Sequence, residues 1–175
     1  LLHRDNLRHV DAIKKNIQLA EFRVFSQFGD DGIIQFLVDY LRPEKTFVEL
    51  GVENYVESNT RFLLMNNNWR GFVVDGSPEN ISECHEHEFY WKHDLIAVAA
   101  WITRENVNTL IRDKGGLSGD VGILHIDLDG NDYWIWNDIN VISPQILILE
   151  YNSVFELNPW TIPYDGNFHR MRAHY

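Results

Sequence analysis

The stretch Thr46-Phe47-Val48-Glu49-Leu50-Gly51 predicts a strand that ends on an acidic residue and a glycine. The stretch Gly71-Phe72-Val73-Val74-Asp75-Gly76-Ser77-Pro78 predicts a second strand that ends on another acid. Two such strands in series are typical of an α/β sheet that binds a nucleoside across the carboxyl ends of its strands. In this interpretation Gly51 lets the backbone approach the ligand, and Asp75 accepts hydrogen bonds from a ribose diol. The plain alternatives are an ordinary strand end for the first stretch and a turn-forming aspartate for the second.

The rest of the chain alternates between predicted helices and strands. Two nearly continuous apolar runs, 121–128 and 146–149, predict strands that are buried on both faces of a parallel sheet. Helices are expected over 32–41, over 62–65 with Ser58 or Asn59 as the cap, from Ser77-Pro78 onward, over 103–112 and over 131–139, and a short strand over 89–92 is expected to lead to Asp94. This alternation predicts a doubly wound, mostly parallel Rossmann-like α/β sheet with helices on both faces.

The chain of 175 residues has the length of one domain, which we expect to carry an N-terminal helical extension over about 1–25. Regular structure fades after Asn152, so we expect the sheet to lack final edge strands. The chain begins with Leu1 rather than Met. We therefore expect a fragment of a longer protein, with the C-terminal edge of the domain cut.

Composition limits the partners of this chain. Its formal net charge of −11 argues against nucleic acid as the main partner, because binding to a phosphate backbone depends on Lys and Arg. No apolar run approaches the roughly 20 residues that a membrane span needs. The single cysteine, Cys84, excludes an internal disulfide and fits a reducing compartment, and no signal peptide opens the sequence. We expect a cytoplasmic protein, and the sequence predicts no oligomeric state.

The first motif is poor in glycine. After Gly51 the chain continues Val-Glu-Asn-Tyr-Val, so the G-x-G-x-x-G fingerprint of dinucleotide sites is absent. Without a glycine-rich cradle for a pyrophosphate, NAD and FAD are disfavoured. A single glycine after an acid is sufficient for a nucleoside that carries no phosphate.

A third motif, His125-Ile126-Asp127-Leu128-Asp129-Gly130-Asn131-Asp132, lies at the end of a predicted central strand. Because strand side chains alternate, His125, Asp127 and Asp129 are expected to share one face. Acids there would hold a divalent cation or act as a general base on a substrate hydroxyl. The alternative is a helix N-cap role for Asp129 or Asn131.

Glu150 ends the next predicted strand. It would lie beside Asp127 or Asp129 if the two strands are neighbours. An acid at a solvated strand end, with no role in a site, is an equally good interpretation.

These motifs together resemble the class I S-adenosylmethionine-dependent methyltransferases, in particular the FkbM-like branch. The resemblance runs from Ser26 to about Tyr164 and includes the entry segment Ser26-Gln27-Phe28-Gly29-Asp30-Asp31-Gly32. It implies that Glu49 and Gly51 flank the methionine part of the cofactor. In the second motif Asp75 would bind the ribose, with Ser77 beside it, and Asp94 would lie near the adenine. Glu53 and Tyr55 stand where the usual first motif has further glycines.

The resemblance also places Asp127 near the sulfonium, where substrate enters. Some related sugar methyltransferases use a divalent cation near this strand, so Asp127, Asp129 and Glu150 are candidate ligands for an ion such as Mg²⁺. The expected activity is O-methylation of a small-molecule or sugar hydroxyl, with Asp127 or His125 as the general base. Two alternatives are a non-catalytic interaction module on the same fold and a metal-assisted α/β hydrolase.

Overall fold

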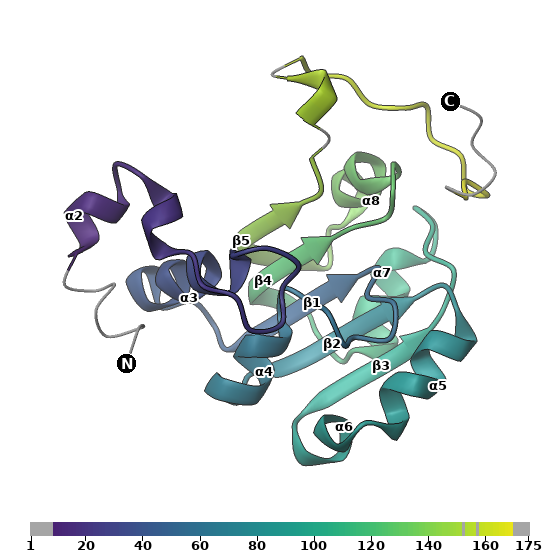
Figure 1. Ribbon diagram of the computed structural model, residues 1–175. Coiled ribbons are helices and arrows are strands. Elements are labelled where there is room, and N and C mark those ends of the chain that lie inside the picture. The colour runs from purple at the N-terminus through teal and green to yellow at the C-terminus, as the bar shows by residue number, and fades with distance from the viewer. Residues whose placement is uncertain (1–8, 152, 157, 170–175) are drawn as a thin grey trace.

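The computed structural model describes residues 9–151, 153–156 and 158–169. They form a five-stranded, all-parallel sheet with the order β3-β2-β1-β4-β5 (Figure 1). The strands are β1 (Thr46–Leu50), β2 (Arg70–Asp75), β3 (Leu95–Ala99), β4 (Gly119–Ile126) and β5 (Ile142–Leu149). Strand order reverses between β1 and β4, as in a doubly wound Rossmann-like sheet. The predicted fold class is confirmed.

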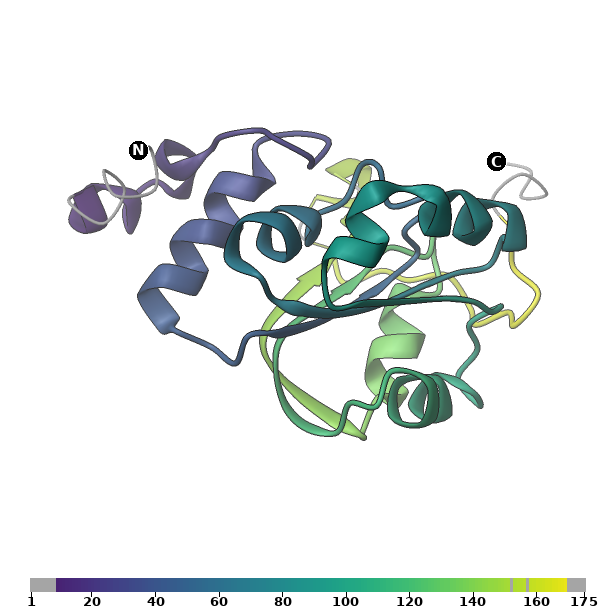
Figure 2. The ribbon, with the colours of Figure 1, turned by 90° about the horizontal axis from the view of Figure 1, so that it is seen from below.

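Helices cover both faces of the sheet (Figure 2). One face packs against α3 (Asp30–Leu41), α4 (Arg61–Asn67), α5 (Pro78–Glu86) and α6 (Glu88–Lys92), and the other against α7 (Val107–Thr109), the π-helical turn η3 (Leu110–Lys114) and α8 (Asp132–Asp138). Alternate strand residues supply the two cores: Phe47 and Val73 face the first group, whereas Val48 and Phe72 face the second. This two-sided burial explains why the strands read as apolar runs.

The predicted strand over 89–92 is wrong. These residues belong to α6, in which Lys92 and Glu88 form an ion pair one helical turn apart. The ring of Phe89 is buried and packs edge-on against Tyr55. Phe89 thus anchors a short helix whose Trp91 is exposed, and the strand follows at Leu95. Asp94 consequently precedes β3 instead of ending a strand.

The described part of the N-terminal extension has two short helical segments, and residues 21–25 after them are not helical. It contains α2 (Val10–Ile13) and the 3₁₀ turn η2 (Ile17–Ala20); residues 1–8, part of the predicted extension, lie outside the described residues. After β5 a 3₁₀ turn, η4 (Ser153–Phe155), leads into an irregular segment that ends at residue 169. No strand follows β5 in the described ranges, as expected for the sheet edge. Within the same ranges no helix has the length and apolar character needed to cross a bilayer.

An aromatic and cationic cluster joins three segments on one face of the sheet. The Arg61 guanidinium lies between the rings of Phe25 and Phe89, 4.5 Å and 4.4 Å from their centroids. It also donates hydrogen bonds to the carbonyls of Tyr55 and Val56. Arg61 therefore ties the entry loop and the loop after β1 to α6.

Candidate functional site

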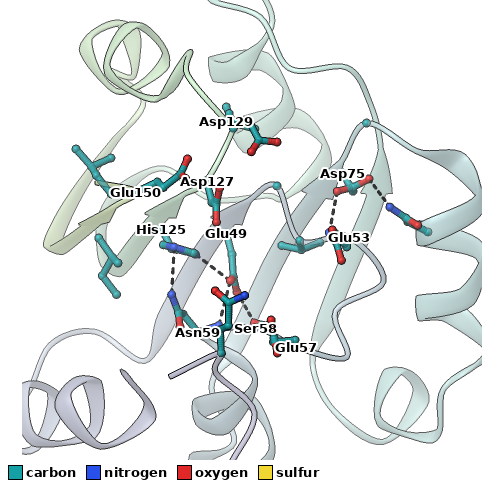
Figure 3. Close-up of a pocket in the computed structure, with 18 of the residues that line it drawn as sticks. Glu49, Glu53, Glu57, Ser58, Asn59, Asp75, His125, Asp127, Asp129 and Glu150 are labelled. Carbon is teal, nitrogen blue, oxygen red and sulfur yellow. Dashed lines mark hydrogen bonds and ion pairs between the residues drawn. The ribbon is translucent and has the colours of Figure 1, made fainter. Parts of the chain in front are cut away.

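A pocket of about 920 Å³ opens at the carboxyl ends of the strands (Figure 3). It spans the point between β1 and β4 where the strand order reverses, which is the usual ligand position in open α/β sheets. Its lining includes Gln27, Phe28, Asp30, Glu49, Gly51, Glu53, Glu57, Ser58, Asn59, Asp75, Ser77, Asn80, Trp101, His125, Asp127, Asp129, Glu150, Tyr151, Phe168 and His169. Eight of these residues are acidic and none is Lys or Arg. Such a lining suits a cationic or neutral ligand and opposes a phosphate.

Glu49 and His125 form a buried ion pair beneath the pocket. They are register partners on β1 and β4, and His125 Nδ1 lies 2.9 Å from Glu49 Oε1. Ser58 and Thr60 donate their hydroxyls to Glu49 Oε2, and the Asn59 amide donates to Oε1. Both oxygens of Glu49 are thus used by the protein, and its side chain is 2% exposed. We therefore assign Glu49 a structural role instead of direct contact with a ligand.

The pair shifts the pKa of each partner. Burial alone would raise the pKa of Glu49, but the hydrogen bond and charge of His125, with the two hydroxyls, hold it below its ordinary value. Burial alone would lower the pKa of His125, but Glu49 outweighs it and the net shift is upward. On its far side His125 Nε2 lies 3.2 Å from Asn59 Nδ2. The two ring nitrogens of His125 thus face Glu49 and the side-chain amide of Asn59.

Gly51 is required by the protein itself. Its φ is +83°, and a Cβ there would lie 1.8 Å from the carbonyl oxygen of Asp127. The space beside Gly51 is therefore filled by the backbone of the loop after β4. The sequence predicted instead that a ligand would approach the backbone there. The glycine still lines the pocket, and its small size lets the two loops meet.

Asp75 reaches the pocket from the end of β2, as predicted. Its Oδ2 accepts from the Glu53 amide at 2.8 Å, and its Oδ1 accepts from the Ser77 amide and Asn80 Nδ2. Because a carboxylate oxygen can accept two hydrogen bonds, Oδ2 keeps one open position. Oδ2 can therefore accept one further hydrogen bond, whereas the amide of Ser77 and the side chain of Asn80 already take the two positions of Oδ1.

Ser77 lies beside Asp75 and lines the pocket, but its hydroxyl caps α5 by accepting from the Asn80 amide. Asp94 is not part of this site. It precedes β3 at the amino end, where its carbonyl accepts from the Gly71 amide, and it does not line the pocket. The expected place of Asp94 beside a base is therefore wrong, because the strand begins after it. The carboxyl end of β3 instead leads to Trp101, which does line the pocket.

Three acids gather at the ends of β4 and β5. Ligand atoms of Asp127, Asp129 and Glu150 all lie within 4.8 Å of one another. The predicted neighbourhood of Glu150 and the two aspartates is confirmed by the β4–β5 pairing. β4 ends at Ile126, and Asp129 has a φ of +58°, so the expected alternation on one strand face does not apply.

Asp132 shapes the loop that holds these acids. Its carboxylate accepts from the amides of Leu128 and Gly130 and turns the chain into α8. Asn131 occupies the N-cap position of α8, but its side chain makes no cap bond. The side chain of Asn131 therefore does not cap α8, although the residue stands at the N-cap position.

Partial burial and the neighbouring negative charges raise the pKa values of two acids in this cluster. Partial burial, together with Asp127, Asp132 and Asp129, raises the pKa of Glu150 to about 7. Burial and the neighbouring acids also raise the pKa of Asp127, against the opposing charge of His125. The cluster can therefore take up a proton or a divalent cation near neutral pH.

Sequence comparison adds no relative. No protein-family model matches this chain, and no curated protein matches it.

Proposed function

We propose that this chain is an S-adenosylmethionine-dependent methyltransferase that acts on a hydroxyl of a small molecule or carbohydrate. The observation that carries the proposal is Asp75, a carboxylate with an open acceptor position, at the carboxyl end of β2 beside the reversal of strand order. The absence of Lys and Arg from the described lining supports a cofactor without phosphates. The many carboxylates support a ligand with a cationic sulfonium.

S-adenosylmethionine supplies a methyl group on a sulfonium, so the reaction needs in-line alignment of donor and acceptor more than activation of the leaving group. In this proposal Asp127 takes the proton as the acceptor oxygen forms its bond to carbon. Its raised pKa favours proton uptake, and it lies at the pocket beside Glu150. His125 is less suited, because Glu49 and Asn59 engage both of its ring nitrogens.

Asp127, Asp129 and Glu150 offer oxygen ligands that suit Mg²⁺. A cation held there would orient the acceptor hydroxyl and lower its pKa. We expect Mg²⁺ to raise the melting temperature of the chain, and Glu150→Gln to reduce this shift. Glu53→Gln, which removes a pocket carboxylate outside the cluster, is the matched control and should respond as the wild type does.

Calorimetry with S-adenosylmethionine and S-adenosylhomocysteine tests the cofactor assignment. Asp75→Ala should weaken binding by about 10- to 100-fold, because a hydrogen bond to a charged group is worth about 1.5–3 kcal/mol. Asp127→Asn should leave binding nearly unchanged and slow transfer in a screen of hydroxyl acceptors. Glu86→Ala, which removes an exposed carboxylate outside the pocket, is the control and should bind as the wild type does. Equal affinities for wild type and Asp75→Ala contradict the ribose assignment, and Mg²⁺ binding without nucleoside binding points to a metal-assisted hydrolase.

A further inference from the structure

The segment 158–169, here called the strap, lies along the pocket edge of the sheet. In Figure 1 it is the yellow trace that passes α8 on its way from β5. Asn131 holds its backbone from both sides, since Nδ2 donates to the Asp165 carbonyl at 2.8 Å and Oδ1 accepts from the Asp165 amide at 3.4 Å. Trp134 Nε1 donates to the Ile162 carbonyl at 2.8 Å. The strap is therefore fixed by side chains of α8 and its cap.

The far end of the strap reaches the loop after β3. Trp101 Nε1 donates to the Gly166 carbonyl at 2.7 Å, and the ring of His169 lies nearly parallel to the indole, at 11° with centroids 6.1 Å apart. A turn closed by Asp165 brings Phe168 and His169 to the pocket, where both are lining residues. A segment distant in sequence thus completes the wall that begins with Trp101.

This wall adjoins the carboxylate that the proposed function assigns to a ribose. A Cβ on Gly76, the residue after Asp75, would lie 2.9 Å from Cε3 of Trp101. The indole therefore packs directly on the end of β2. An acceptor for a sugar hydroxyl and an aromatic surface consequently lie side by side, as the two halves of a nucleoside require.

We propose that the strap forms one wall of a nucleobase subsite, in which Trp101 and His169 contact a planar base. The ligand class is a nucleoside with a free ribose diol and no phosphate, because the described lining offers carboxylates and no Lys or Arg. Stacking on aromatic side chains is a general way of holding a base. This inference rests on the proposed function, and it adds that the nucleoside half of the site is incomplete without the strap. Asn131 is a positioning residue, since it holds the strap but does not line the pocket.

The test is calorimetry with S-adenosylhomocysteine and adenosine on the whole chain. His169→Ala should weaken both ligands about tenfold, as expected for the loss of one stacking partner. Asn131→Ala and Trp134→Phe, which release the strap outside the pocket, should each weaken both ligands several-fold while the chain still unfolds cooperatively. Thr161→Ala changes an exposed strap residue away from the pocket and should bind as the wild type does.

The outcomes separate the strap from the cofactor. If the wild type binds S-adenosylhomocysteine and all variants bind it equally, the strap is not part of the subsite, and the proposed function stands. If the wild type binds adenosine or another nucleoside but neither S-adenosylmethionine nor S-adenosylhomocysteine, and His169→Ala loses that binding, the subsite stands and the methyl donor is wrong. If the wild type binds no nucleoside, the nucleobase subsite and the proposed function are both overturned.

Discussion

Replacing Glu49 by Gln should destabilise the fold by about 2 kcal/mol. The side chain keeps its size and one carbonyl oxygen but loses the charge that pairs with His125 and accepts two hydroxyls and an amide. Hydrogen bonds to charged groups are worth about 1.5–3 kcal/mol and neutral ones about 0.5–1.5 kcal/mol. A Gln side chain would replace one or two charged hydrogen bonds by neutral ones. The difference between the two kinds of bond, summed over one to two bonds, gives the loss of about 2 kcal/mol. For a domain of this size it corresponds to a fall of about 4–8 °C in melting temperature.

Urea unfolding measures the effect, and a double-mutant cycle with His125→Asn isolates the pair. Asn carries an amide nitrogen near the place of Nδ1, so the second variant removes the ring charge with little other change. We expect a coupling free energy of about 1 kcal/mol or more. Additive single effects, or a stability loss below about 0.5 kcal/mol in Glu49→Gln, would refute the assignment of this pair as a charged contact.

The pair should also set a pH window. The pKa of Glu49 is lowered in the fold from its ordinary 4.5, so its contribution is present above pH 4.5 and is lost as the pH falls through the folded value. The pKa of His125 is raised from 6.5, so its contribution is complete below pH 6.5 and is lost as the pH rises through the folded value. The stability gap between wild type and Glu49→Gln should therefore be largest between pH 4.5 and pH 6.5. A gap that does not depend on pH contradicts this account.

Two further predictions concern groups outside the pocket. Arg61→Lys should cost about 1–2 kcal/mol in urea unfolding, because an ammonium cannot lie flat between Phe25 and Phe89 while reaching two backbone carbonyls; an unchanged midpoint argues against the double stacking. The Cys84 thiol is fully buried and burial raises its pKa to about 11, so at pH 8 it should react with a disulfide reagent at least about 100-fold more slowly in the folded chain than in urea. Comparable rates in the two states would show that the thiol is accessible.

The sheet was predictable from the sequence because its strands are buried on both faces. β1 begins at Thr46 and ends one residue before Gly51, and β2 begins one residue before Gly71 and ends on the expected acid, Asp75. Ser77 and Pro78 marked the start of α5 through ordinary capping chemistry. The error at 89–92 arose because alternating periodicity and a single helical turn cannot be distinguished in four residues. Only the packing of Phe89 against Tyr55 decides between them.

The candidate site was predictable where it follows from strand ends. Asp75, Asp127 and Glu150 lie where a parallel sheet gathers its carboxyl termini, and the resemblance pointed to the same acids. The Glu49–His125 pair depends on strand register, which the sequence does not show. Trp101 and His169 depend on the path of the strap, for which no periodic pattern exists.

The contact between Gly51 and the Asp127 carbonyl constrains how this chain can diverge in evolution. The loops after β1 and β4 share a space that admits no side chain at residue 51. A homologue with a larger residue there would need a β4–α8 loop that stands farther from β1, and its acids would leave the pocket. Glycine at the end of the first motif and carboxylates at the end of β4 should therefore be inherited or lost together, whatever acceptor each descendant uses.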